Sequence, residues 1–110
     1  MATFVKGDVI VVPFPFSDLS GEKKRPAMVI TELDGDDIIL CQITSQQISD
    51  RYSIQLGDQD FDEGTLKKSS NLRPNRIFTA DKQIILYKVG RLKKQKIDQI
   101  IQKIIEIIKT

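Results

Sequence analysis

Apolar residues in the first half of the chain come in short runs separated by turn residues, a pattern typical of a β-rich domain. The segment 8–14 is rich in Val and Phe and ends among prolines, and 25–33 and 38–45 are two further apolar runs. Between these two runs, the stretch 34–37 reads Asp-Gly-Asp-Asp, with a glycine where a tight turn needs a permissive backbone. The pattern predicts a strand over 8–14 and a hairpin over 25–44.

The second half carries shorter strand signals. In 51–58, apolar and aromatic residues alternate and predict a strand, whereas 59–69 reads as a loop or a short turn of helix. A further strand is predicted over 70–81, where Pro74 indicates an edge or a bulge because it cannot donate to the ladder. The stretch 82–92 fits either a strand throughout or a turn of helix followed by a strand.

The C-terminal segment 93–110 has the clearest periodicity. Its isoleucines recur at helical spacing with Lys, Gln and Glu between them, at Ile97, Ile100, Ile101, Ile104, Ile105 and Ile108. We expect an amphipathic helix that turns this stripe toward the core, with Ile107 off the stripe and available to another chain. Several short strands followed by one helix predict a small, curled, barrel-like sheet.

The size of the chain favours one domain covering residues 1–110. No segment approaches the roughly 20 consecutive apolar residues that a membrane span needs. The first residues lack the layout of a signal peptide. We therefore expect a cytoplasmic protein without a membrane partner.

Cysteine and histidine usage excludes several kinds of chemistry. Cys41 is the one cysteine, so no disulfide can form within the chain, and its apolar context fits a buried structural thiol better than a reactive one. There is no histidine, which removes the usual general acid–base residue and the imidazole ligands of zinc and iron sites. We expect no metal and no cofactor.

Charge is unevenly distributed although the net charge is only +2. Residues 32–63 contain nine acidic side chains and one basic one, whereas residues 65–96 contain ten basic side chains and one acidic one. A second basic cluster, Lys23-Lys24-Arg25, stands directly before an apolar run. Such asymmetry indicates a polyanion or an acidic partner, and the alternative is that these charges form solvated faces.

Three stretches, in this order, resemble the MazF/PemK family of toxins from bacterial toxin–antitoxin pairs. The first contains Gly7-Asp8, Phe14-Pro15-Phe16, a polar loop over 17–24 and Arg25-Pro26; the second is Gln-Ile-Thr-Ser at 42–45; the third is 79–92, with Thr79, Asp81 and Gly90-Arg91-Leu92. Each piece alone is weak. Together, at this spacing, they are fairly specific and span nearly the whole chain.

The resemblance implies a mainly β (α+β) fold, a small SH3-like barrel of five to seven short strands with a C-terminal amphipathic helix. It also implies a homodimer that cleaves single-stranded RNA sequence-specifically and without a metal. The implied protein partner is a cognate antitoxin whose disordered tail covers the RNA groove.

Arg25 and Thr44 match the family's catalytic arginine and threonine. Metal-free cleavage begins with attack of the ribose 2′-hydroxyl on the adjacent phosphate, and a guanidinium fork stabilises the charge that builds on the phosphoryl oxygens. The predicted hairpin places the start of one strand beside the end of the next, so the two residues should lie close together. Without the resemblance, Arg25 would read as a surface arginine and Thr44 as an ordinary strand residue.

One branch of the family uses an Arg and an Asp as acid and base, and the matching positions here are Arg73 and Asn75. An amide does not act as a base, so that mechanism does not transfer to this chain. Glu22 is the nearest candidate carboxylate to Arg25, and a solvated loop charge is the alternative for it. The sequence does not identify the proton acceptor.

The candidate RNA-binding residues fall into three groups. Lys23 and Lys24 would contact phosphates. Phe16 would stack on a base or, alternatively, pack against its own loop. The remaining candidates, for reading base edges or lining the groove, are Ser17, Ser45, Gln46, Arg73, Asn75 and Arg76.

Two other functions compete with an RNA-cleaving toxin. One is a CcdB-like toxin that binds DNA gyrase, which the absence of any Trp at the C-terminal end argues against. The other is a non-catalytic SH3-like nucleic-acid-binding module, which would keep the basic surface without needing Arg25 beside Thr44.

Overall fold

The computed structural model describes residues 3–14 and 23–110. Its strands are β1 (Asp8–Phe14), β2 (Lys23–Glu32), β3 (Asp37–Thr44), β4 (Ile54–Leu56), β5 (Phe61–Gly64), β6 (Ser70–Asp81) and β7 (Tyr87–Leu92). Two single-turn 3₁₀ helices, η1 (Asp58–Asp60) and η2 (Lys82–Ile84), precede β5 and β7, and the helix α1 (Lys94–Lys109) ends the chain. The predicted mainly β fold with a C-terminal helix is therefore confirmed.

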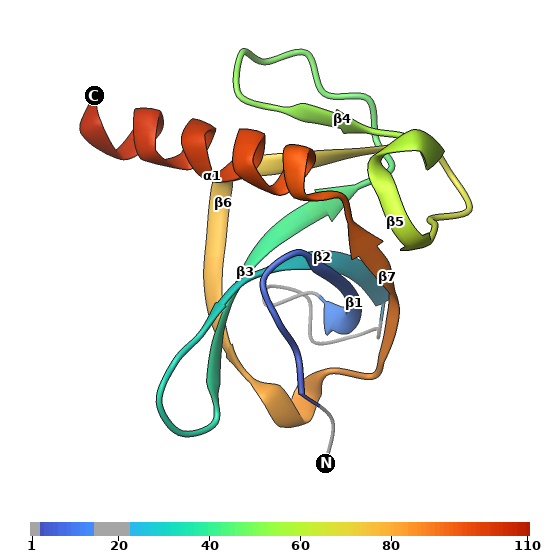
Figure 1. Ribbon diagram of the computed structural model, residues 1–110, viewed down its shortest axis with the longest axis vertical. Helices are drawn as coiled ribbons and strands as arrows, with labels where there is room; N and C mark the ends of the chain where they lie inside the picture. The colour runs from blue at the N-terminus through green and yellow to red at the C-terminus, as the bar shows by residue number, and fades with distance from the viewer. Residues whose placement is uncertain (1–2, 15–22) are drawn as a thin grey trace.

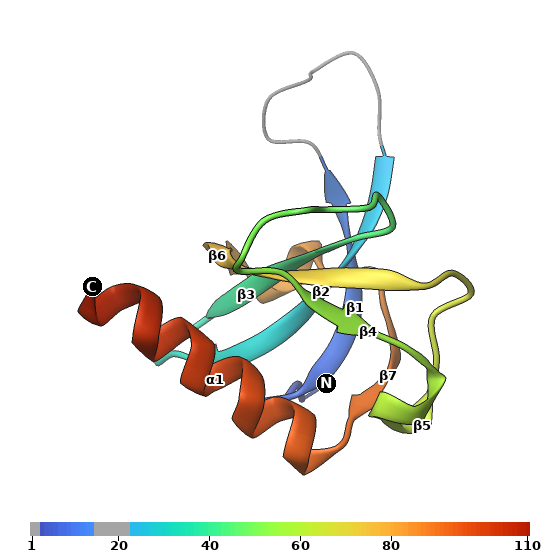
Figure 2. The ribbon, with the colours of Figure 1, turned by 90° about the horizontal axis from the view of Figure 1, so that it is seen from above.

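All seven strands belong to one antiparallel sheet in the order β4-β6-β3-β2-β1-β7-β5. The two edge strands, β4 and β5, follow each other in the chain and are joined only by the short segment 57–60. This connection requires the ends of the sheet to approach each other, so the sheet curls into a half-barrel (Figure 1). Helix α1 lies across the curled sheet, contacts β6 and packs Ile100 and Ile104 into a core cluster with residues of both edge strands (Figure 2).

The central strands bury side chains on both of their faces. Val9 of β1 belongs to a core cluster that includes Ile100 and Ile104 of α1. Its neighbour Ile10 points to a second cluster, which Phe78 and other half-buried apolar residues cover. Burial on both faces explains why β1 reads as a continuous apolar run rather than as an alternating pattern.

Most strand predictions are confirmed, and two are corrected. The strand 8–14, the hairpin and the helical turn followed by a strand over 82–92 are present. The strand expected over 51–58 is limited to Ile54–Leu56, and 59–69 contains the strand β5 as well as part of the predicted turn. Phe61 starts β5 and is buried in the core, but its neighbours Asp62 and Glu63 are exposed and mask the strand signal.

Pro74 lies in a bulge, as predicted. The pairing of β3 with β6 steps from Cys41↔Ile77 to Ile43↔Leu72, so the segment 73–76 faces a single residue of β3. The bulge accommodates a proline because its missing N–H is not needed there.

Helix α1 is present, but only part of its isoleucine stripe is core. Ile97, Ile100 and Ile104 pack into the core, whereas Ile105 is 39% exposed and Ile108 is 72% exposed. Ile107, expected off the stripe, is half-buried. The side of the helix that faces the sheet is thus narrower than the sequence periodicity indicates. Within the described ranges, no helix is long and apolar enough to cross a membrane.

Candidate functional site

Arg25 and Thr44 lie at the same end of the β2–β3 hairpin. The pairing of β2 with β3 puts Ala27 opposite Gln42, and continuing this register along both strands puts Arg25 opposite Thr44. Both residues line one cavity of about 820 Å³. The structure thus brings together the two residues that the sequence singled out for catalysis.

The cavity is strongly basic. Five of its lining residues are cationic, Lys23, Lys24, Arg25, Lys67 and Lys68, and its described lining contains no Asp or Glu. Lysines and an arginine around one hollow, with no carboxylate to offset them, raise the local positive potential and favour an anionic ligand.

Two of these five cations, and one aromatic residue of the lining, were not predicted from the sequence. Lys67 and Lys68 come from the loop between β5 and β6, and Tyr87 comes from the start of β7. The sequence shows an excess of positive charge after residue 65, but this excess does not tell which residues line the cavity. The curl of the sheet is what carries this loop across to the end of the hairpin.

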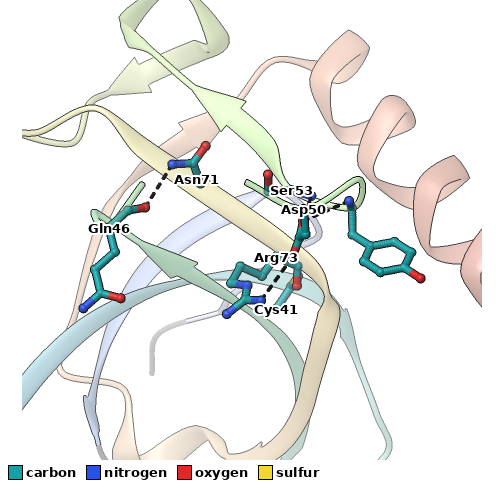
Figure 3. A network of polar contacts seen from close by, with 7 residues as sticks. Cys41, Gln46, Asp50, Ser53, Asn71 and Arg73 are labelled. Carbon is teal, nitrogen blue, oxygen red and sulfur yellow. Dashed lines mark hydrogen bonds and ion pairs between the residues drawn. The ribbon is translucent and has the colours of Figure 1, made fainter. Parts of the chain in front are cut away.

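Thr44 is held by its own loop. Its side chain is nearly buried, with the residue 4% exposed, and its hydroxyl oxygen accepts the backbone N–H of Gln46 at 3.1 Å. The carbonyl of Gln46 in turn accepts a 3.1 Å hydrogen bond from the side-chain amide of Asn71 on β6 (Figure 3). Because the Thr44 oxygen is the acceptor, its hydroxyl proton can be donated to a molecule in the cavity.

Arg73, one of the predicted RNA-binding residues, contacts other residues of the protein. Its Nη2 lies 3.2 Å from a carboxylate oxygen of Asp50, and its carbonyl accepts a 3.0 Å hydrogen bond from the thiol of Cys41 (Figure 3). Asp50 also accepts the backbone N–H groups of Ser53 and Tyr52, at 2.8 and 2.9 Å. Hydrogen bonds hold the pKa of Asp50 below its ordinary value, and the one from the backbone N–H of Ser53 has the largest effect.

These contacts fasten the segment 45–53 to β6, and they place Arg73 outside the lining of the cavity. Asn75 and Arg76 are exposed on the bulge of β6, and exposed Gln46 also lies outside that lining, whereas exposed Ser45 lines the cavity. Phe16, Ser17 and Glu22 lie outside the described residues.

A second polar cluster explains the signature residues at the two ends of the chain. Asp8 is 1% exposed, and its carboxylate accepts a 2.9 Å hydrogen bond from Nε of Arg91 and lies 3.4 Å from Nζ of Lys88. Lys88 also donates to Glu63 at 2.8 Å, and this hydrogen bond lowers the pKa of Glu63. The cluster joins β1, β5 and β7, so its role is structural.

Gly7, the other member of that signature, has a backbone that only glycine adopts readily. Its φ is +95°, and a Cβ at this position would collide with the side chain of Ile97 on α1. Its N–H donates to Val29, and its carbonyl accepts from Leu92. The Gly-Asp pair therefore fixes where the helix and β7 meet β1.

Cys41 is a buried structural thiol, as predicted. It is 0% exposed, and burial raises its pKa to about 12. At neutral pH the thiol is therefore protonated and unreactive. In the described part of the chain, no group of three or more His, Cys, Asp or Glu residues could hold a metal ion.

Comparison with known proteins identifies one matching family. The model of a family described as PemK-like, MazF-like toxin of type II toxin–antitoxin system matches residues 5–108. No curated protein matches the sequence.

Several solved structures share the fold. A MazE–MazF complex from Deinococcus radiodurans superposes with a TM-score of 0.78 at 12% identity, covering 100% of this chain and 99% of that one. An endoribonuclease from a mycobacterial species gives 0.74 at 13% identity, covering 98% and 93%. A mycobacterial endoribonuclease in complex with its cognate antitoxin gives 0.74 at 13% identity, covering 96% and 95%.

Proposed function

This chain belongs to the PemK-like, MazF-like toxin family of type II toxin–antitoxin systems, and we propose that it is an endoribonuclease that cleaves single-stranded RNA, including messenger RNA. Cleavage would inhibit translation and growth, and it would take place in the cytoplasm, where the substrate is. The observation that carries the proposal is the meeting of Arg25 and Thr44 in one basic cavity.

In the proposed reaction, the 2′-hydroxyl oxygen attacks the adjacent phosphorus and the bond from phosphorus to the 5′-oxygen breaks. The 2′-hydroxyl loses its proton, the leaving 5′-oxygen gains one, and the products are a 2′,3′-cyclic phosphate and a 5′-hydroxyl. Arg25 binds the non-bridging oxygens with its guanidinium, and Thr44 donates its hydroxyl proton to the same charge. The step uses no metal and no cofactor.

The flanking nucleotides would be held mainly through phosphates. Lys23, Lys24, Lys67 and Lys68 lie around the cavity, and each can neutralise a phosphate. Ser45, in the same lining, would read a base edge. Gln46, Arg73, Asn75 and Arg76, which lie outside the cavity lining, stay proposed RNA contacts, as do Phe16 and Ser17, which lie outside the described residues.

Two protein partners follow from the same assignment. The Deinococcus MazF and one mycobacterial endoribonuclease have been solved with MazE or a cognate antitoxin. We infer a cognate antitoxin for this chain, with a disordered acidic tail that covers the basic cavity. We also infer a homodimer, for which exposed Ile105 and Ile108 offer apolar surface on α1.

The activity can be tested with a long single-stranded RNA incubated in EDTA with the purified protein or with Arg25→Ala. We expect discrete cuts by the wild type that end in cyclic phosphates and none by the variant. Arg51→Ala is the matched control, because Arg51 is an exposed arginine outside the cavity.

The result also separates the competing functions. Cuts that disappear in EDTA would contradict the metal-independent mechanism. Binding without cuts would assign the chain to the non-catalytic modules, and inhibition of DNA gyrase without RNA binding would assign it to the CcdB-like toxins.

A further inference from the structure

Tyr87 presents an aromatic ring at the cavity that no role assigned above uses. It is 54% exposed, although it stands on a strand of the sheet and lines the same cavity as Arg25 and Thr44. A large exposed aromatic residue at a binding cavity is a candidate ligand contact, because its burial by a ligand is favourable.

Tyr87 ends an apolar row that crosses four neighbouring strands. Tyr87 of β7 pairs with Val11 of β1, Val11 pairs with Pro26 of β2, and continuing the β2–β3 register puts Pro26 opposite Ile43. Directly opposite residues in antiparallel strands project to the same face. All four residues line the cavity, so this apolar row is its floor.

The position of Tyr87 in the row is fixed by its neighbours. Val11 and Ile43 are buried, and Leu66 and Val89 pack against the core cluster that contains Ile43. The next residue, Lys88, is tied to Glu63 at 2.8 Å and lies 3.4 Å from Asp8. The β7 backbone at Tyr87 is therefore held on both sides, and the ring is presented without a loop having to order.

The residues around Tyr87 indicate the chemical class of the ligand. Lys67 and Lys68 stand on the loop next to Leu66, and Lys23 and Lys24 stand at the start of β2. A flat apolar strip bordered by cations matches a chain that alternates flat bases with phosphates. A peptide tail would use the cations but has no general need for an exposed ring over an apolar floor.

We propose that Tyr87 stacks on a nucleobase of the RNA and seats it on the apolar row next to the phosphate held by Arg25. The proposal rests on the proposed endoribonuclease function and adds a base-binding residue to it. Because every base has a π-face, this contact tolerates any base.

A spectroscopic test uses the tyrosines themselves. The chain has two tyrosines and no tryptophan, so Tyr52→Phe leaves Tyr87 as the only strong emitter. Single-stranded DNA serves as the probe because it lacks the 2′-hydroxyl and is not cut. We expect DNA to quench Tyr87 emission on binding and an abasic oligonucleotide of the same length to leave it unchanged.

Kinetics provides the second measurement. Tyr87→Ala should raise KM for RNA about 5- to 150-fold, with a smaller effect on kcat, and Tyr87→Phe should restore KM. Leu86→Ala is the matched control, since Leu86 is 47% exposed beside Tyr87 but does not line the cavity.

The outcomes distinguish this inference from the function on which it rests. If the wild type cuts RNA while Tyr87→Ala keeps its KM and DNA leaves the emission unchanged, the stacking role is wrong and the enzyme assignment stands. If the wild type does not cut RNA, the enzyme assignment fails and the DNA titration still decides the stacking role. Quenching only by a peptide of the antitoxin tail would also overturn the proposal.

Discussion

The carboxylate of Asp8 accepts a 2.9 Å hydrogen bond from Nε of Arg91, a residue 83 positions further along the chain. Asp8 is 1% exposed and also accepts the backbone N–H of Val5 at 2.9 Å. This pair joins the start of β1 to the end of β7 beside the point where α1 begins. Two signature residues that resemble those of a toxin family thus serve to hold β1 to its neighbour β7.

Replacing Asp8 by Asn should destabilise the protein by about 3 kcal/mol, because the buried carboxylate of Asp8 loses its charge and its charge-assisted hydrogen bond from Arg91. Urea denaturation followed by circular dichroism measures this change. Asp98→Asn is the control: Asp98 is 68% exposed and lies 4.0 Å from Lys94, so its loss should cost less than about 0.5 kcal/mol. Equal effects of the two substitutions would refute a special role for the Asp8–Arg91 pair.

Replacing Thr44 by Val should lower kcat for RNA cleavage about 10²- to 10³-fold, as expected when one donor to the transition-state charge is removed. Valine keeps the shape of threonine, so the fold should persist. Thr44→Ser is the control, since it keeps both the hydroxyl and the acceptor for the N–H of Gln46. Single-turnover rates on one RNA compare the three proteins, and a Val variant as fast as the wild type would remove Thr44 from the reaction.

The double substitution of Lys67 and Lys68 by Gln should flatten the salt dependence of RNA binding. Each phosphate neutralised on a single strand contributes about 0.7 to the slope of log K against log salt, so the slope should fall by up to about 1.4. Lys94 and Lys109, at the ends of α1 and outside the cavity, provide a control pair of equal charge change. An unchanged slope in the Lys67/Lys68 variant would take this loop out of the RNA path.

Cys41 should react with a thiol reagent such as DTNB only when the protein opens. Its raised pKa, about 12, leaves almost no thiolate at neutral pH, and the residue is 0% exposed. In urea the thiol should recover an ordinary pKa near 8.5 and react completely. The rate of labelling against urea concentration checks this, and fast labelling of the native protein would contradict the burial of Cys41.

The hairpin and the helix were predictable because their signals are local. A turn between two apolar runs determines which residues of 25–44 face each other, and that was enough to place Arg25 near Thr44. The helical spacing of the isoleucines predicted α1 for the same reason, since it too is a local pattern. It did not show that Ile105 and Ile108 are exposed, because the width of the packed side depends on how the helix lies on β6.

The remaining features depend on contacts between distant segments. Strand β5 was hidden by its acidic exposed residues, and it forms because β7 offers it an edge, with Phe61 opposite Leu92. The ion pair between Arg73 and Asp50 was not predictable, because it forms where the bulge at Pro74 and the segment 45–53 meet. Lys67, Lys68 and Tyr87 reach the cavity only through the curl of the sheet, which no local pattern encodes.

The basic loop 65–69 lies between two strands that pair with different partners, β5 with β7 and β6 with β3 and β4. Arg25 and Thr44, by contrast, stand on strands that pair with each other. The pair proposed to react with RNA and the loop beside it can therefore vary independently. New loop sequences or lengths, grafted between Gly64 and Ser70, would make a library of nucleases that share one chemistry and differ in the RNA they choose.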